Sequence, residues 1–119
     1  MAGTNDLNAG NTQDPISSAP GRLGSLIDQI VKACPDAVVV VAKLVPNTGS
    51  GKPALVATFN AAVSGLVQTR QAAGAKVILA DMFSAVDPSQ LGDRLHPNDN
   101  GYTGMAAEWY RVIAEAAGR

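Results

Sequence analysis

The chain has 119 residues with nine basic and ten acidic side chains, a net charge of −1 and 46% apolar residues. That length allows one domain with a real core, and it is too short for two ordinary domains. The small net charge excludes a strong long-range field for nucleic acid or an anionic membrane, and no run of about 18 apolar residues could span a membrane. Because Cys34 is the only cysteine, neither an intrachain disulfide nor a cysteine metal cluster is expected.

The first half of the chain predicts a loop, a helix, a strand and a second loop. Residues 3–20 are rich in Gly, Asn, Thr, Asp, Ser and Pro, which is typical of a long polar loop. Apolar residues recur at helical spacing over residues 21–34, and Pro35 then breaks the pattern. Residues 37–42 form a continuous apolar run rich in valine, which predicts a strand covered on both faces. Residues 45–52 form a loop rich in Asn, Gly and Ser.

The second half predicts a helix, a strand, a long loop and a final helix. Pro53 fits the first turn of a helix that continues to Gly74, a suitable C-terminal stop. Residues 75–81 predict a second buried strand, residues 82–100 a loop, and residues 101–117 a helix. The inward face expected for that last helix is Tyr102, Met105, Ala106, Trp109, Tyr110, Ile113 and Ala116. This alternation implies right-handed crossovers and a parallel sheet with helices on both faces.

The stretch Asp93-Arg94-Leu95-His96-Pro97 holds the only histidine of the chain, outside any regular helix or strand pattern. A neutral imidazole can take and return a proton near pH 7, and an aspartate within reach can fix its tautomer. Pro97 biases His96 toward an extended conformation, which predicts a shaped loop that presents the ring. The plain alternative is a surface loop in which Asp93 caps a turn. Loops at the carboxyl ends of parallel strands meet at one rim, and since Asn5 is expected there too, this favours the catalytic interpretation.

Two blocks at opposite ends of the chain resemble the SGNH hydrolases, also called the GDSL esterase/lipase superfamily. These are Gly3-Thr4-Asn5-Asp6, which matches the family's G-x-N-D, and Asp93 to His96, which matches its D-x-x-H. The residues from His96 to Ala106 also look like the family's H-P-N-x-x-G-Y-x-x-M-A. The resemblance covers essentially the whole chain and is strongest to carbohydrate esterases that deacetylate xylan and related sugars. It implies an α/β fold: a three-layer α/β/α, flavodoxin-like arrangement around a parallel sheet.

The resemblance implies a role for each matching residue. His96 corresponds to the general base, Asp93 to its orienting acid, Asn5 to the side-chain amide of the oxyanion hole, and Gly3 to the close backbone beside it. A preorganised donor at an oxyanion is worth roughly 3–4 kcal/mol. The plain alternative for Asn5 is an Asx-turn, and Asp6 is expected to tether its loop. The implied reaction is serine acyl transfer on a small ester or acetylated carbohydrate, with no cofactor and no metal.

The family's Gly-Asp-Ser nucleophile block has no match in this sequence, and no serine lies in a G-x-S-x-G setting. We therefore expect residues 1–119 to be the C-terminal part of an SGNH domain whose N-terminal strands and nucleophile are missing from this chain. The chain alone would then be inactive, and its open sheet edge would favour self-association or a complementing N-terminal segment. An alternative function is an inactive fragment that serves as an association module. The parent family is commonly secreted, although no signal-peptide pattern follows Met1.

Residues 49–54 read G-x-G-x-x-A between a predicted strand and a predicted helix, which is a dinucleotide-binding pattern. Pro53 removes an amide near the anion site, and no acidic residue stands about 20 positions further on, where such sites hold the ribose. A nucleotide site is therefore disfavoured. The acidic residues and His96 also lack metal-ligand spacing, so that a metal site is not expected.

Overall fold

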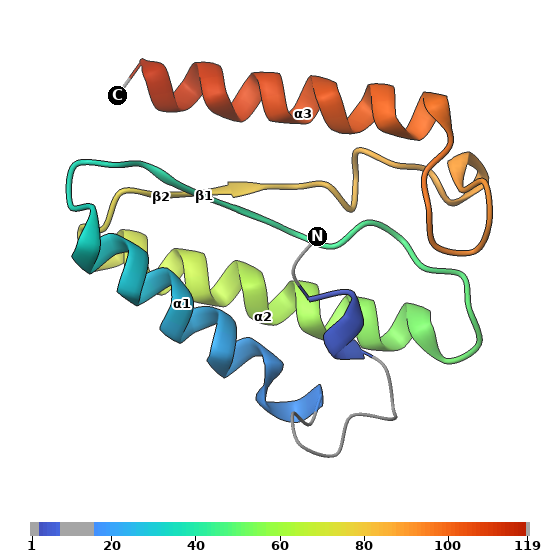
Figure 1. Ribbon diagram of the computed structural model, residues 1–119, viewed down its shortest axis with the longest axis horizontal. Coiled ribbons are helices and arrows are strands. Elements are labelled where there is room, and N and C mark those ends of the chain that lie inside the picture. Colours follow the sequence, from blue (N-terminus) through green and yellow to red (C-terminus); the bar gives the residue numbers. More distant parts are fainter. Residues whose placement is uncertain (1–2, 8–15, 119) are drawn as a thin grey trace.

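Three helices and two strands follow the predicted order along the part of the chain that the structure describes. The computed structural model describes residues 3–7 and 16–118 (Figure 1). Its main elements are α1 (Ala19–Ala33), β1 (Val39–Ala42), α2 (Lys52–Ala72), β2 (Val77–Ala80) and α3 (Asp99–Ala117), with short 3-10 turns at Asn5–Leu7, Ile16–Ser18 and Pro88–Gln90. The predicted helices and strands are confirmed, with their ends displaced by a few residues.

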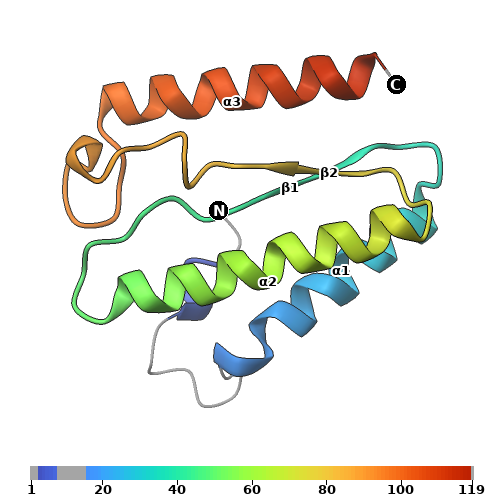
Figure 2. The same cartoon turned by 180° about the vertical axis from the view of Figure 1, so that it is seen from behind.

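The two strands form a parallel pair in which Val39 lies opposite Val77 and Ala42 opposite Ala80. A parallel pair needs a crossover, and α2 supplies it. Helices α1 and α2 cover one face of the sheet and α3 covers the other, as the two opposite views show (Figures 1 and 2). The expected three-layer α/β/α arrangement is therefore confirmed.

Each face of the sheet carries its own apolar core, because successive strand residues point to opposite sides. Val41 and Val77 pack with α1 and α2, whereas Ile78 and Ala80 pack under α3. The α1–α2 core is completed by Leu7, Ala19, Ile27, Leu44, Val56, Phe59, Val63 and Val67. The α3 core is smaller and contains Val45, Met82, Val86 and Val112.

A buried asparagine of α2 pairs with the backbone just beyond the end of the first strand. Asn60 of α2 accepts a hydrogen bond from the Leu44 amide at 2.8 Å and donates one to the Leu44 carbonyl at 3.0 Å. Both residues are almost fully buried, with 6% and 2% of their surface exposed. The amide thus pairs both backbone groups of Leu44 where water cannot reach them.

The face predicted for the last helix was wrong in part. Met105 and Ala116 lie on the packed side as expected, but Tyr102, Ala106, Trp109, Tyr110 and Ile113 are exposed. The buried residues of α3 are instead Gly101, which lies against Gln90 and Pro97, and Val112, which packs with Ile78 and Ala80 of β2.

Close packing also requires a glycine at one position of α3. A Cβ atom built on Gly104 would lie 2.1 Å from the carbonyl oxygen of Ala85. The helix therefore rests directly on the backbone of the loop that follows β2. Among the residues described, no helix is apolar and long enough to cross a membrane.

Candidate functional site

The loop that carries the histidine contains a hydrogen-bonded carboxylate–imidazole pair. Asp93 Oδ2 lies 2.7 Å from His96 Nδ1. The other oxygen, Oδ1, accepts hydrogen bonds from the amides of Leu95 at 2.7 Å and His96 at 2.6 Å. Since an ionised carboxylate can only accept, Nδ1 donates to it, and Nε2 is the ring nitrogen left to exchange a proton in the cavity. That arrangement is the one a general base needs.

The same contacts keep Asp93 ionised. Hydrogen bonds from the His96 amide, the His96 ring and the Leu95 amide hold the pKa of the Asp93 carboxyl well below its usual range. Both side chains of the pair are more than half exposed, so solvent reaches them freely. The pair is positioned by hydrogen bonds rather than by burial.

The backbone around the pair closes on itself directly before α3. Leu91 forms an antiparallel bridge with Pro97, and the Gly92 amide donates to the His96 carbonyl at 2.7 Å. The Asn98 side chain then caps α3 by accepting from the Gly101 amide at 3.1 Å. We call residues 91–98 the back loop. Most of the contacts that shape it join residues within a few positions of one another.

The front block, residues 3–7, is held by contacts with residues far away in the sequence. Asp6 pairs with Arg22 of α1 at 2.6 Å, and the carbonyl of Leu7 accepts from Lys52 Nζ at 2.7 Å. Gly3 adopts φ 108°, and a Cβ there would lie 3.0 Å from the Phe59 ring. A side chain at this position would therefore be both strained and crowded. Asn5 lies between these anchors with its side chain exposed.

The structure brings the front block and the back loop to one cavity. The cavity measures about 330 Å³ and is lined by Thr4, Asn5, Leu95, His96, Pro97, Tyr102 and Met105. The predicted base and the predicted oxyanion donor thus face a common space, while Asp93 lies behind His96. Gly3 does not line the cavity. Its contribution is limited to the backbone conformation next to Asn5. The catalytic roles of these four residues stay predictions.

Two residues of the cavity wall, Tyr102 and Met105, were predicted to be core residues. Met105 packs against the α3 core as expected and also lines the cavity, whereas the exposed Tyr102 lines the cavity only. Periodicity predicts which side of a helix is apolar, but it cannot distinguish core from cavity wall. Thr4 also lines the cavity, and the sequence predicted no role for it.

The loop after β1 contacts both halves of the site. The Thr48 amide donates to the carbonyl of Arg94 in the back loop at 2.9 Å, and Lys52 at the start of α2 binds the front block. Asn47 stiffens this loop by accepting from the Gly49 amide at 2.9 Å. We call residues 45–52 the linking loop. This loop leads from β1 into α2 and contacts both halves of the site. Its glycine pattern therefore has a structural role here.

No group of three or more His, Cys, Asp or Glu side chains lies close enough to hold a metal ion within residues 3–7 and 16–118. The cavity itself contains one imidazole, one carboxamide and two hydroxyl groups as its polar side chains. Such a set can exchange protons and donate hydrogen bonds to a small polar group.

Comparison with known sequences decides the family. The model of the GDSL-like lipase/acylhydrolase family matches residues 1–103, and these include both halves of the site. The chain belongs to this GDSL-like family. A curated relative, putative endoglucanase X of Acetivibrio thermocellus, is 34% identical over 96 residues, which cover 78% of this chain and 41% of the relative.

Solved structures of several esterases share the fold. A family 3 carbohydrate esterase from Talaromyces cellulolyticus superposes with a TM-score of 0.77 at 27% identity, covering 98% of this chain and 56% of its own. A mutant acetyl esterase solved with an acetate ion gives 0.79 at 28% identity, covering 97% and 55%. The family 3 carbohydrate esterase of Clostridium thermocellum gives 0.67 at 30% identity, covering 81% and 47%. The chain therefore spans about half the length of these relatives.

Proposed function

We propose that this chain is the part of a GDSL-type ester hydrolase that supplies the general base and one oxyanion-hole donor. His96 is the base, Asp93 orients it, and Asn5 provides the donor. The observation that carries the proposal is the single cavity lined by both Asn5 and His96, with His96 bonded to Asp93 at 2.7 Å behind it. Membership of the GDSL-like family supports the same roles.

The proposed reaction is acyl transfer through a serine. Nε2 of His96 takes the proton of the serine hydroxyl as its oxygen bonds to the ester carbonyl carbon. The carbonyl oxygen becomes negative and receives a hydrogen bond from the Asn5 amide. Collapse of the tetrahedral intermediate breaks the ester C–O bond, and His96 returns the proton to the departing alcohol. Water then repeats the sequence and releases the acid.

The proposed substrate is a small ester, preferably an acetylated carbohydrate. Leu95, Pro97 and Met105 give the cavity an apolar wall that suits a short acyl group. The carbohydrate esterases among the solved relatives support the sugar as the alcohol component.

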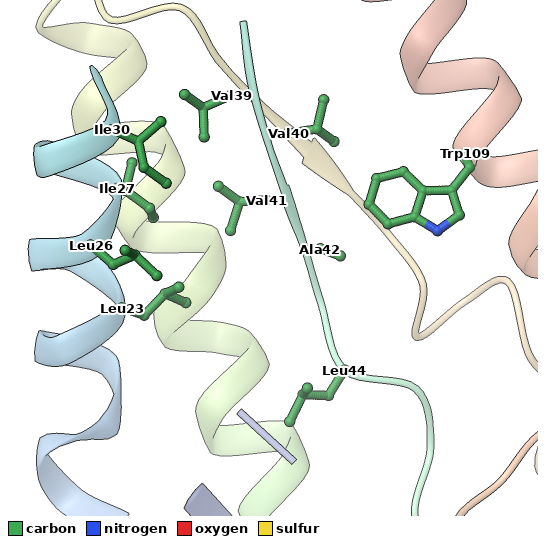
Figure 3. A pocket seen from close by; sticks show the side chains of 10 residues that line it. All are labelled: Leu23, Leu26, Ile27, Ile30, Val39, Val40, Val41, Ala42, Leu44 and Trp109. Atoms are coloured by element: carbon green, nitrogen blue, oxygen red, sulfur yellow. The ribbon is translucent and has the colours of Figure 1, made fainter. Parts of the chain in front are cut away.

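The serine itself is expected from outside this chain. Among the residues that line the cavity, hydroxyl groups come from Thr4 and Tyr102, and no serine is present. The chain alone is therefore expected to be inactive. The second candidate function, an association module without catalysis, is favoured by an apolar groove of about 280 Å³ between α1, β1 and Trp109 (Figure 3).

The test is complementation. This chain is mixed with the portion of the Talaromyces cellulolyticus esterase that it does not cover, produced as a separate polypeptide, and hydrolysis of an aryl acetate is measured. We expect no turnover by either part and turnover by the mixture. His96→Ala should abolish it, and Asn5→Ala should lower kcat by about 100- to 1000-fold with little change in KM.

Asp87→Asn is the matched control, because Asp87 also caps a turn through its carboxylate but does so outside the cavity. Its mixture should turn over like the unmodified one. Restored activity that survives His96→Ala would contradict the catalytic proposal. Tight binding without any turnover would support the association module instead.

A further inference from the structure

One contact from outside the back loop reaches the candidate base through a single peptide group. The amide of Thr48 in the linking loop donates to the carbonyl of Arg94 at 2.9 Å. That carbonyl belongs to the same peptide group as the Leu95 amide, which donates to Asp93 Oδ1 at 2.7 Å. Asp93 Oδ2 in turn lies 2.7 Å from Nδ1 of His96. A continuous row of hydrogen bonds therefore leads from the linking loop to the imidazole.

The rigidity of the peptide group makes this row a mechanical link. A peptide group is planar, and rotation about its C–N bond is blocked by a high barrier. The carbonyl of Arg94 and the amide of Leu95 therefore cannot turn independently of one another. A donor that holds the carbonyl also aims the N–H group at Asp93. Hydrogen bonds in such a chain polarise one another, which strengthens each by about 10–30%.

The carboxylate–imidazole pair needs such support because burial does not hold it. The side chains of Asp93 and His96 are 60% and 69% exposed. The bonds between them and the Leu95 amide join near neighbours, which could move together as one unit. The Thr48 contact instead ties this unit to a residue 46 positions away from Arg94.

The parallel sheet brings the two loops together. The linking loop follows β1 and the back loop comes after β2, and the carboxyl ends of parallel strands lie at one edge of the sheet. The loop before α3 and the loop between β1 and α2 accordingly lie at the same end of the molecule (Figures 1 and 2). The contact between them is thus a product of the fold.

The linking loop presents the Thr48 amide from a compact turn. Asn47 Oδ1 accepts from the Gly49 amide at 2.9 Å, and this bond closes the chain around Thr48. The Gly49 carbonyl accepts from the Lys52 amide at 3.0 Å, where α2 begins. A Cβ atom on Gly49 would lie 3.1 Å from Asn47 Oδ1, so the turn leaves little free space. The donor is therefore held in place before it meets the back loop.

We propose that Thr48 is a positioning residue for the base. Its amide holds the Arg94–Leu95 peptide group and thereby keeps Asp93 aligned with Nδ1 of His96. That the aligned imidazole acts as a base rests on the proposed function, whereas the alignment rests on contacts within this chain alone. The ring tautomer of His96 should then depend on an amide in the linking loop.

The experiment compares two full-length chains that differ in one backbone group. Thr48→Val keeps the amide and lacks only the hydroxyl, whose oxygen lies 3.5 Å from the Arg94 carbonyl and contributes little. In the second chain, 2-hydroxy-3-methylbutyrate at position 48 keeps the shape of valine but replaces the N–H group by an ester oxygen. Nitrogen-15 shifts of the His96 ring then give the ratio of its Nε2–H to its Nδ1–H form, at about pH 9, well above the ordinary pKa of an imidazole.

The unmodified chain and Thr48→Val should both hold the ring mainly as the Nδ1–H form. The ester should raise the ratio of Nε2–H to Nδ1–H about threefold, as expected when one neutral hydrogen bond of an exposed loop is lost. The Leu95 amide proton should move upfield in the same chain, because its bond to Asp93 lengthens.

Lys52→Met is the matched control, since it removes a bond from the same loop to the front block but keeps the Thr48 amide. It should leave the tautomer ratio unchanged, and melting temperatures are measured alongside. If the ester chain does not fold, Asn47→Ala takes its place. This variant keeps every backbone amide but opens the turn around Thr48, and it should raise the ratio about twofold.

Three results would overturn the proposal: the same ratio in the ester chain as in Thr48→Val, a change of equal size in Lys52→Met, or no response to Asn47→Ala where the ester chain does not fold. Failure of the proposed function looks different. In that case the ratio responds as expected, but the complemented mixture does not hydrolyse an aryl acetate. Hydrolysis that requires His96, together with an unresponsive ratio, would leave the function standing and remove Thr48 from it.

Discussion

The two halves of the candidate site are built in opposite ways. In the back loop, the contacts that shape Asp93 and His96 join residues two to three positions apart. In the front block, the anchors of Asp6 and Leu7 come from residues 16 and 45 positions away. The imidazole–carboxylate pair is therefore a local structure, whereas the place of Asn5 depends on the packing of α1 and α2. Changes to the tertiary structure should disturb the front block more than the back loop.

The largest effect is expected from Asn60→Leu. This substitution keeps the volume but leaves both backbone groups of Leu44 buried and unpaired, which should cost about 2–4 kcal/mol of the free energy of unfolding. Because Leu44 leads into the linking loop, the amide resonances of residues 3–7 should shift more than those of residues 93–96. Urea denaturation and NMR spectra measure the two effects. Ser64→Ala on the same helix is the control and should change stability by less than about 0.5 kcal/mol.

Gly104→Ala should have the next largest effect. The new methyl group would meet the Ala85 carbonyl at 2.1 Å, so that α3 must move away from the loop after β2. We expect a loss of about 2 kcal/mol, with the back loop disturbed first because α3 begins right after it. Gly65→Ala in α2, where nothing lies within 4 Å, should instead be neutral or raise the stability by up to about 1 kcal/mol. Equal melting temperatures for the two variants would contradict this account.

Lys52→Met tests most directly whether the front block and the back loop are held independently. It removes the hydrogen bond to the Leu7 carbonyl and keeps most of the aliphatic side chain, which should cost about 1 kcal/mol. Amide exchange should accelerate in residues 3–7, while the Asp93–His96 contacts remain unchanged. Lys32→Met on α1, an exposed lysine, should leave exchange at residues 3–7 as it is. A disturbance of similar size in the back loop would show that the halves are not independently held.

The smallest effect is the response of the back loop to acid. Since the folded pKa of Asp93 is depressed, its hydrogen bonds contribute fully above the ordinary pKa of an aspartate and are lost as pH falls toward the lowered value. The Leu95 and His96 amide shifts should therefore stay constant as pH drops through about 4 and move only in stronger acid. Asp93→Asn should remove this transition. A shift centred near pH 4 in the unmodified chain would contradict the depressed pKa.

Much of this protein was predictable from short-range patterns. Periodicity located α1, α2 and α3, and apolar runs located β1 and β2, because these signals depend on neighbours within one or two turns. The spacing of Asp93 and His96, followed by Pro97, predicted a loop that presents the ring, and the structure adds the 2.7 Å contact. The parallel-sheet rule then predicted that Asn5 and His96 would meet at one rim, and both line the same cavity.

Only the tertiary structure decided which side chains each surface uses. Tyr102 and Trp109 were expected in the core, yet one lines the cavity and the other an open groove. The contacts of Asn60 with Leu44 and of Lys52 with Leu7 had no signal in the sequence, because each joins residues that only the packing of helices on the sheet brings together. Contacts between residues close in the sequence form the helices, the strands and the imidazole–carboxylate pair. The distances between elements are set by side chains that meet across the fold, and no pattern within one segment contains them.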